Sequence, residues 1–466
     1  MDSSAIAVFD LLPDEDVVGI LSKIENLNDL FSLCRTSARI DKICQDPIFW
    51  KNKYKQDFGD KYLPDGDLKL PYIIRTKAKE SNLLSSGHKH AGMVDKNGIL
   101  HMWGDNEYGQ LGDGMTSSRE EPVKIPFESK VICISCGYQS TAAVTENGEV
   151  FIWGRDQHAT TPKKVNIPSK IVKVSLGPDL IKPNTAALSE DGLVYHWYFG
   201  NPQLVPTTIK MIDIASTFGF SIGIREFSYL SMISEDMKLY HFIVKGGSFF
   251  VKIRPLPEPI LSVSDGFSYA GVLSISGNVY LYGANGVGQL GTGHPGLIVP
   301  ETGLYDTINS TDDLNKISLS SPIILLSCRY WVTSAITLDN KLYMWGSNVG
   351  NKIFIEKDPR LLNVAYQELF PKGYFLAGND ANKPPSFNIE ISNGRVTHVG
   401  SKIRFDLSES DERSTITFPS LATPTQIDIG YPVTSISTGT LFSIAKTSDG
   451  RVNQWGGSFH QFADES

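Results

Sequence analysis

The spacing of apolar residues changes once along the chain, between about residues 60 and 85. Before that point apolar residues recur three and four positions apart, as on one face of a helix. Val17, Ile20, Leu21 and Ile24 form one such stripe. Beyond it, apolar and polar residues alternate in short runs, which is typical of strands with one buried face. The pattern predicts a small helical region followed by a much larger region of β-strands.

Start and stop signals divide the helical region into short helices. Pro13 precedes three acidic residues, as at many helix starts, and Asn26 or Asn28 can cap a second helix. A third is predicted around Ile40–Cys44. The pair Asp46-Pro47 begins a last helix with an aromatic stripe, made of Phe49, Trp50, Tyr54 and Phe58. So small a region cannot bury all these side chains internally, so some should face the neighbouring domain or another protein.

The β-rich region repeats one unit, seen clearly in ICISCGYQSTAAVTENGEVFIWG (Ile132–Gly154). It contains a strand, a glycine, a second strand, Asn147-Gly148 and a third strand that ends in an aromatic residue and glycine. An Asn-Gly pair between alternating runs predicts a tight hairpin with positive φ at both central residues. We count eight such hairpins, whose aromatic residues or substitutes are Trp103, Trp153, Trp197, Phe242, Tyr282, Trp345, Val399 and Trp455.

The period of the repeat indicates the architecture. The hairpins recur about every 50 residues, with one or two further apolar runs between them, so each unit has about four strands. Four-stranded units at this period predict a β-propeller, in which neighbouring blades stack and the ring closes. The ten residues after Gly456 are too few for another blade. We therefore expect a ring-closing strand from the N-terminal side, at Lys69–Lys77.

The repeat resembles that of the regulator-of-chromosome-condensation propellers. WGDNEYGQLGDG (Trp103–Gly114) and YGANGVGQLGTG (Tyr282–Gly293) share an aromatic-glycine pair followed by Asn-x-x-Gly-Gln-Leu-Gly. The family's turn histidine is present as His90 and is replaced by Ser140 and Ala270 in two other units. The resemblance implies a mostly β fold, a propeller of four-stranded blades. The family ring has seven blades, so either one degenerate unit is an excursion or the ring has eight.

The helical region is similar to an F-box. The matching segments are Leu12-Pro13, the run Val17–Cys34 and ICQDPIFWKNKYKQDFG (Ile43–Gly59). Many F-boxes have a tryptophan near the start of the third helix, where this chain reads RTSARI (Arg35–Ile40). The resemblances divide the chain into an all-α F-box at 8–58, a linker with the possible closing strand at 59–82, and a propeller at 83–466.

Together the two resemblances imply a substrate receptor of a Skp–cullin–F-box ubiquitin ligase. The helices would bind a Skp-family adaptor of a cullin–RING ligase, and the propeller would hold an unknown target protein for ubiquitination and proteasomal degradation. The alternatives are a nucleotide-exchange or chromatin-associated propeller for a small nuclear GTPase, or a non-catalytic interaction scaffold. The residues expected to bind the adaptor are Leu12, Pro13, Val17, Ile20, Leu21, Ile24, Leu30, Leu33, Ile43 and Trp50.

Composition narrows the function classes. The net charge of −8 argues against a chain whose main role is binding nucleic acid, and the basic stretch Lys51–Lys79 is interpreted as a solvated face or a local patch. The chain has no run of 18 apolar residues and begins with an acidic segment, so neither a membrane span nor a secretory signal is expected. Five cysteines do not form a disulfide scaffold and favour a reducing compartment, nuclear or cytoplasmic.

No motif in the sequence indicates catalysis, a metal site or a cofactor. Cys133 and Cys136 are three positions apart, on opposite faces of a strand, and His88 and His90 lack a further ligand. The glycine-rich loops are not followed by a helix or Gly-Lys-Ser/Thr, as a phosphate loop requires. Two long loops are expected at 297–321 and 401–425, either as disordered segments or for target contact and phosphoregulation.

Overall fold

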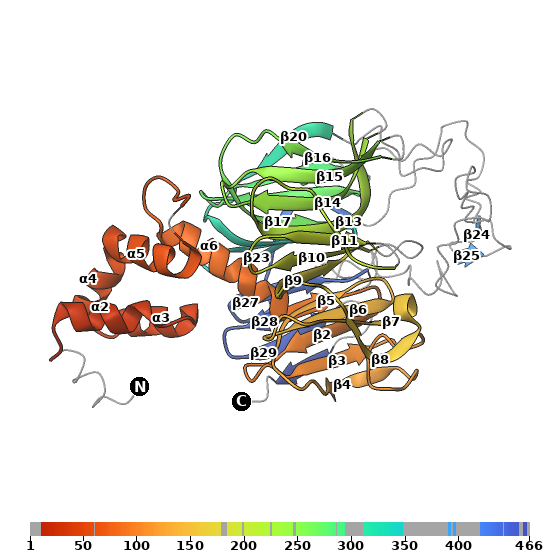
Figure 1. Cartoon of the computed structure of the whole chain (residues 1–466), viewed down its shortest axis with the longest axis horizontal. Helices are drawn as coiled ribbons and strands as arrows, with labels where there is room; N and C mark the ends of the chain where they lie inside the picture. The colour runs from red at the N-terminus through yellow and green to blue at the C-terminus, as the bar shows by residue number, and fades with distance from the viewer. Residues whose placement is uncertain are drawn as a thin grey trace.

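The computed structural model describes residues 11–59, 61–178, 184–197, 200–223, 226–245, 248–285, 287–293, 311–347, 390–392, 395–397, 420–440, 442–455 and 460–463. Figure 1 shows a ring of β-sheets with a group of helices at one side. The helices are α2 (Asp14–Ser22), α3 (Leu27–Cys34), α4 (Ala38–Gln45), α5 (Pro47–Phe58) and α6 (Lys69–Glu80). No helix in these ranges has the length and apolar character needed to cross a membrane.

The ring is a seven-bladed propeller of four-stranded antiparallel sheets. The innermost strands surround the axis and each contacts the next, including β27 and β1, which close the ring. These inner strands are β1 (Leu84–Ser86), β5 (Val131–Cys136), β9 (Ile171–Leu176), β13 (Met211–Gly223), β17 (Ile260–Asp265), β21 (Ile323–Arg329) and β27 (Val433–Thr438). The fold class expected from the repeat is therefore confirmed, with seven blades.

Each inner strand is followed by two strands that form the predicted hairpin. The second strands are β2 (His90–Val94), β6 (Ser140–Thr145), β10 (Thr185–Ser189), β14 (Glu226–Ser234), β18 (Tyr269–Ser274), β22 (Val332–Thr337) and β28 (Ser443–Thr447). The third strands are β3 (Leu100–Gly104), β7 (Val150–Gly154), β11 (Val194–Trp197), β15 (Leu239–Lys245), β19 (Val279–Gly283), β23 (Leu342–Ser347) and β29 (Arg451–Trp455).

A fourth strand lies at the outer edge of every blade. The outer strands are β4 (Arg119–Ile125), β8 (Ala159–Val165), β12 (Gln203–Leu204), β16 (Ser248–Arg254), β20 (Thr311–Ile317), β26 (Ser420–Ile427) and β30 (His460–Ala463). The two expected long loops, 297–321 and 401–425, lie outside the described residues as far as 310 and 419. The described parts of both segments begin with a strand, β20 in the first and β26 in the second, and not with a loop.

The eighth hairpin is an excursion. Its strands β24 (Glu390–Ser392) and β25 (Arg395–Thr397) form a two-stranded sheet of their own. They fall between β23 and β26, which are neighbours in the sixth blade. The first of the two alternatives for the count of eight is therefore correct.

The predicted ring-closing strand is wrong, because Lys69–Lys77 lies in helix α6. The Asp67 carboxylate accepts a hydrogen bond from the Lys69 N–H (2.9 Å) at the start of this helix, and Pro71 lies in its first turn, where proline is tolerated. The first and last blades each have four strands of their own. They are joined instead by side chains: Trp103 donates to the Gln454 amide oxygen (2.8 Å).

The hairpin turns also differ from the expected type. The Gly148 N–H donates to the Thr145 carbonyl (2.8 Å), and the Thr145 N–H donates to the Glu149 carbonyl (3.0 Å). Only Gly148 has positive φ (80°) in this turn. This is a three-residue loop ending in a left-handed glycine, which also matches the twist of the flanking strands.

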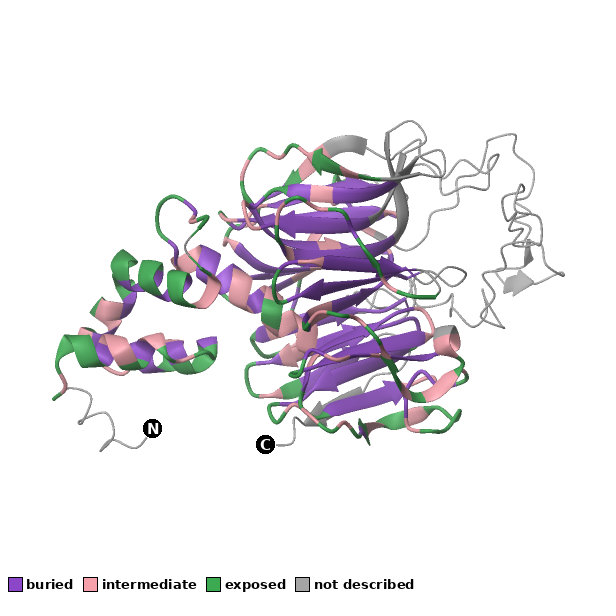
Figure 2. Cartoon of the chain, in the orientation of Figure 1, coloured by how far each residue is buried: buried purple, intermediate pink, exposed green. Residues whose placement is uncertain are grey.

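Buried residues follow the strands of the ring and the inner faces of the helices (Figure 2). One apolar core runs from the helices into the fifth, sixth and seventh blades, so the two regions share packing. Four of the remaining cores each lie between two neighbouring blades of the first five, and the last joins the first and seventh blades. The blades therefore depend on their neighbours for burial, as expected for stacked repeats.

Candidate functional site

In the helical unit, which comprises residues 11–59 with helices α2 to α5, side chains cap the starts of α3, α4 and α5. The Asn26 side chain accepts hydrogen bonds from the N–H groups of Asn28 (2.9 Å) and Asp29 (3.2 Å), so Asn26 caps α3. Ser37 caps α4 in the same way, and Asp46 caps α5 with proline at its first position. These caps fix the helix boundaries, which lets short helices of weak intrinsic stability persist.

The ten residues predicted to bind an adaptor divide into two groups. Five are buried in the core of the helical unit: Val17, Leu21, Leu30, Leu33 and Trp50. The other five remain partly or largely accessible: Leu12, Pro13, Ile20, Ile24 and Ile43. The first group therefore shapes the unit, and only the second can touch a partner without unfolding it.

Two further apolar side chains are the most exposed of the helical unit. Leu11 is 84% exposed and Ile48 is 65% exposed, compared with 37% for Ile20. Ile48 follows the Asp46-Pro47 cap and is two positions before the buried Trp50. It therefore lies on the opposite side of α5 from the aromatic stripe, so the periodicity did not select it. Its exposure is the signal: a large apolar side chain on a helix, left uncovered by the rest of the described chain.

Helix α6 fixes the helical unit to the propeller. Its buried side chains Tyr72, Ile73 and Ile74 lie in the core shared with the fifth and sixth blades, and α6 contacts the inner strands β17 and β21. Lys61, between α5 and α6, pairs with Glu235 of the fourth blade (2.6 Å). That hydrogen bond raises the pKa of Lys61. The helices are thus held against the ring by packing and by an ion pair.

The basic stretch Lys51–Lys79 is used internally to a large extent. The Lys53 ammonium is buried, donates to the Ser22 carbonyl (2.8 Å) and pairs with Asp57 (3.2 Å). Arg75 lies 4.3 Å from the centre of the Phe58 ring, and Lys79 lies 4.7 Å from it. These cation–π contacts join α5 to α6, so much of the patch serves packing between helices.

A disulfide joins Cys34 at the end of α3 to Cys44 in α4. The sequence analysis did not predict it, because the two residues are ten positions apart and each falls on an apolar stripe. Both cysteines are buried. The bridge cross-links the two helices within the core of the helical unit.

The axis of the propeller is lined by serines that link neighbouring blades. The hydroxyl of Ser85 accepts from the Cys136 N–H (2.9 Å), and that of Ser135 accepts from the Leu176 N–H (2.9 Å). Equivalent bonds run from Ser216 N–H to Ser175 (2.9 Å), Cys328 N–H to Ser264 (2.8 Å) and Ser86 N–H to Ser437 (3.0 Å). A serine recurring near the end of six of the seven inner strands was the available sequence signal.

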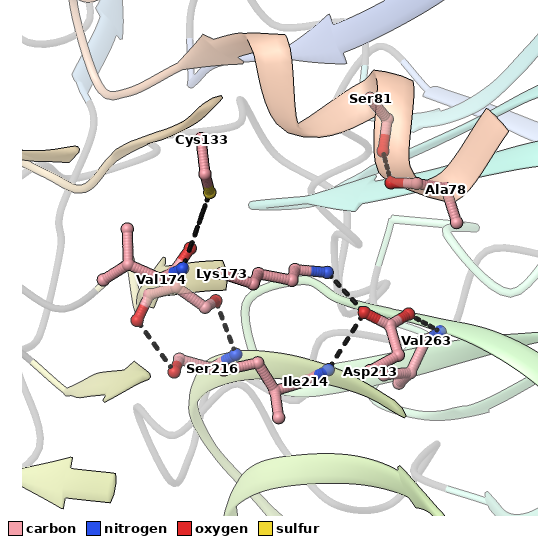
Figure 3. A network of polar contacts seen from close by, with 10 residues as sticks. Ala78, Ser81, Cys133, Lys173, Val174, Asp213, Ile214, Ser216 and Val263 are labelled. Atoms are coloured by element: carbon pink, nitrogen blue, oxygen red, sulfur yellow. Dashed lines mark hydrogen bonds and ion pairs between the residues drawn. The ribbon is translucent and has the colours of Figure 1, made fainter. Parts of the chain in front are cut away.

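Asp213 replaces this serine link at the fourth blade (Figure 3). Its carboxylate accepts from the Val263 N–H of the fifth blade (2.9 Å) and the Ile214 N–H (3.0 Å), and it pairs with Lys173 of the third (2.5 Å). Arg329 crosses the axis at the other end of the inner strands and donates to carbonyls of three blades. A polar cavity of about 110 Å³ remains between them.

The repeated Gly-Gln-Leu-Gly loops bind each blade to the next. The Gln110 carbonyl accepts hydrogen bonds from Trp153 Nε1 (2.9 Å) and the Thr141 hydroxyl (2.7 Å) of the second blade. In the fifth blade the Gln289 carbonyl accepts from Trp345 Nε1 (3.0 Å) and the Thr333 hydroxyl (2.8 Å). In both blades the loop therefore joins its neighbour through a backbone carbonyl.

The position of the turn histidine was assigned wrongly in the fifth unit. His90 pairs in register with Gly104, and Tyr269, not Ala270, pairs with the equivalent Gly283. Both side chains reach the threonine of the next blade: His90 Nε2 lies 3.0 Å from the Thr141 hydroxyl, and the Tyr269 hydroxyl lies 3.1 Å from the Thr333 hydroxyl. Burial lowers the pKa of His90 to about 3, so this histidine is neutral.

The pairs considered for metal binding do not converge. Cys133 packs against Val174 of the third blade (3.7 Å), and Cys136 against Ser85 of the first (3.5 Å). Burial raises the pKa of Cys133 to about 11 and that of Cys136 to about 12. His88 stacks on the Tyr138 ring, 4.2 Å between centres. Within the described ranges no three His, Cys, Asp or Glu side chains group as metal ligands do.

Comparison with known proteins agrees with this propeller geometry. The family model of the regulator of chromosome condensation (RCC1) repeat matches residues 97–144, and a second model of that repeat matches 131–159. The chain is 24% identical over 353 residues to the ultraviolet-B receptor UVR8 of Arabidopsis thaliana, covering 67% of this chain and 74% of the receptor. It is 24% identical over 311 residues to the regulator of chromosome condensation of Drosophila melanogaster, of which it spans only 55%.

Solved structures show the same fold. Human WBSCR16 superposes with a TM-score of 0.53 at 13% identity, over 78% of this chain and 86% of that protein. Prp20p of Saccharomyces cerevisiae, studied with its binding to Gsp1p and histones, gives 0.52 at 16% identity, over 82% and 84%. The chain therefore carries RCC1 repeats folded as a seven-bladed β-propeller.

Proposed function

We propose that this protein is a non-catalytic adaptor with two protein-binding parts, the propeller and the helical unit. The observation that carries the proposal is the exposed apolar surface of a helical unit that is firmly attached to the ring. Ile48 and Leu11 are largely exposed there, while α6 is buried against the fifth and sixth blades. A unit held by one side and apolar on another fits a protein that joins two partners.

For the helical unit we propose a Skp-family adaptor of a cullin–RING ubiquitin ligase as the partner. Leu12, Pro13, Ile20, Ile24 and Ile43 would contact it, and Leu11 and Ile48 would extend that surface. Val17, Leu21, Leu30, Leu33 and Trp50 would support the shape from the core. The propeller would then hold a target protein, raising the effective concentration of its lysines near the charged conjugating enzyme.

The test is co-purification of the full chain with a Skp-family adaptor. Ile20→Asp with Ile48→Asp should reduce adaptor affinity by about tenfold or more, since each places a charge in an apolar contact. Met115→Asp is the matched control, because Met115 is 56% exposed but lies in the first blade. If the Ile20→Asp, Ile48→Asp double variant binds the adaptor as well as the Met115→Asp control and the native chain do, the helical unit is excluded as the docking site.

A second candidate is favoured by the comparisons: nucleotide exchange on a small GTPase, or association with chromatin. The similarity to the Drosophila regulator of chromosome condensation and to Prp20p supports it. The net charge of −8 weighs against chromatin binding. Release of labelled GDP from purified small nuclear GTPase, with and without the full chain, tests it. Acceleration of release would establish exchange, and its absence together with adaptor binding would leave the first proposal.

A further inference from the structure

The outer strands of a propeller are exposed edges, and most of them here are protected against pairing with other chains. Ile125, Val165 and Ile427 occupy equivalent places, each in register with the first residue of the third strand of its blade. Three positions before each is a proline: Pro122, Pro162 and Pro424. Proline lacks the N–H that an added strand would need, so it blocks edge pairing.

Three other outer strands are protected differently. Strand β12 has only two residues, and β30 has four. Strand β20 has no proline, but its sequence TDDLNKI contains three charged residues. Short length and charge are the other common ways in which natural edges avoid association.

Strand β16 of the fourth blade is neither short nor interrupted by proline, and the charged residues that it carries, Lys252 and Arg254, are both basic. It has seven residues, and in its blade Arg254 pairs with Leu239, so Val251 stands where the other blades have proline. Phe250 and Ile253 take the places of Glu121 and Lys124 of the first blade. Each is 48% exposed, and they are among the most exposed large apolar residues of the propeller. Within the described residues no strand lies on the outer side of β16.

The charged residues of this edge strand are all basic. Strand β16 contains Lys252 and Arg254 and no acidic residue. Two copies of β16 would bring these like charges together, which disfavours self-association. An incoming strand with acidic side chains would instead be attracted.

We propose that β16 is a docking edge for an extended protein segment in which apolar and acidic residues alternate. The segment adds a fifth strand to the fourth blade. Its backbone pairs with β16. Its apolar side chains cover Val251 and Ile253 on one face of the sheet, and its carboxylates lie beside Lys252 on the opposite face. Main-chain bonds give affinity and side-chain contacts give selectivity in this mode of recognition. This inference rests on the proposed protein-binding role of the propeller and names where the partner docks.

The direct test is fluorescence anisotropy of a labelled synthetic peptide, Asp-Val-Glu-Ile-Asp-Val-Glu, titrated with the full-length chain. The native chain should bind it, and a Lys-for-acid version or one with proline at the centre should bind about tenfold more weakly or not at all. Phe250→Glu with Ile253→Lys gives β16 the residue types that the first blade has at the equivalent positions, and it should abolish binding. Both positions are exposed, so the melting temperature should not change. Met115→Lys is the matched surface control and should bind normally.

Three results would overturn the proposal. Equal binding of the acidic and basic peptides would remove the charge argument, and undiminished binding by the double variant would place the site elsewhere. Concentration-dependent dimerisation in light scattering, lost in the double variant, would make a second copy the occupant. If target proteins still co-purify with the double variant, this edge is excluded while the protein-binding role stands; if the native chain retains no protein partner, both fail.

Discussion

Two kinds of junction hold the ring together, and they differ in what carries the contact. Between the first and second blades, and between the fifth and sixth, a backbone carbonyl in a glycine-rich loop accepts from a tryptophan and a threonine. Around the fourth blade the links are side chains: Asp213 binds Lys173 and the Val263 N–H, and His241 Nε2 lies 3.2 Å from the Tyr282 hydroxyl. At the fourth blade, therefore, contacts to both neighbouring blades run through buried ionisable side chains.

The comparison predicts its largest effect at the regular junctions. Trp153→Ala should lower the free energy of unfolding by about 3–5 kcal/mol, because a fully buried indole is lost together with its bond to Gln110. Trp197→Ala, in the third blade, should lower the free energy of unfolding by less, since within the described residues the Trp197 indole donates no hydrogen bond to a carbonyl. Urea denaturation followed by circular dichroism measures both. Equal losses would mean that the loop carbonyl contributes nothing specific.

The next effect is expected at the fourth blade. Asp213→Ala should destabilise the fold by about 3 kcal/mol, because it strands a mostly buried Lys173 ammonium and leaves the Val263 N–H unpaired. Replacing both charges, Lys173→Met with Asp213→Leu, should recover most of the loss, since two apolar groups need no partner. Thermal unfolding of the three proteins gives the comparison. No recovery in the double variant would show that Asp213 acts mainly through the backbone N–H groups.

A smaller effect separates backbone strain from close approach in the first loop. Gly112 and Gly114 both have φ of 82°. A Cβ on Gly112 would lie 2.6 Å from the Trp153 ring, whereas one on Gly114 would lie 3.8 Å from its nearest neighbour. Alanine should therefore cost about 1–2 kcal/mol at Gly114, from φ alone, and clearly more at Gly112. Matched denaturation curves decide; equal costs would mean that Trp153 yields without penalty.

These contacts show which parts of the structure the sequence could predict. The hairpin period gave the propeller, because each blade repeats the same order of glycine, alternating strand and aromatic residue. The doubled Gly-Gln-Leu-Gly motif also follows this order, and in its first copy a Cβ on Gly112 would lie 2.6 Å from the Trp153 ring. The serine links were missed, since each is one residue whose partner lies in another blade.

The helices show a different limit. Periodicity identifies an apolar face but not what covers it, so five of the ten expected adaptor residues proved to be core. The run at Lys69–Lys77 was read as a strand because short apolar runs do not distinguish strand from buried helix. Its position against the inner strands of the fifth and sixth blades depends on tertiary packing of α6 on β17 and β21, which the local sequence pattern does not reveal. The edge at β16 was likewise visible only once register aligned the outer strands.

The smallest predicted effect depends on pH. It concerns Asp265 in the fifth blade, whose inner strand β17 contacts the fourth blade. Asp265 is buried at the end of β17, and neither carboxylate oxygen accepts a hydrogen bond from the described residues. Burial raises its pKa well above the usual value. The native state then holds this proton where the unfolded chain has released it, so its contribution to stability is greatest below about pH 4 and falls as pH rises toward the folded pKa.

Asp265→Asn removes the titration and should flatten the fall in Tm between pH 4 and pH 7 relative to the native chain. Ser264→Ala, the neighbour on the same strand, should leave the pH slope unchanged. Parallel slopes for Asp265→Asn and the native chain would mean that the carboxyl is already paired in solution, and the junction would then resemble the regular ones in being independent of protonation.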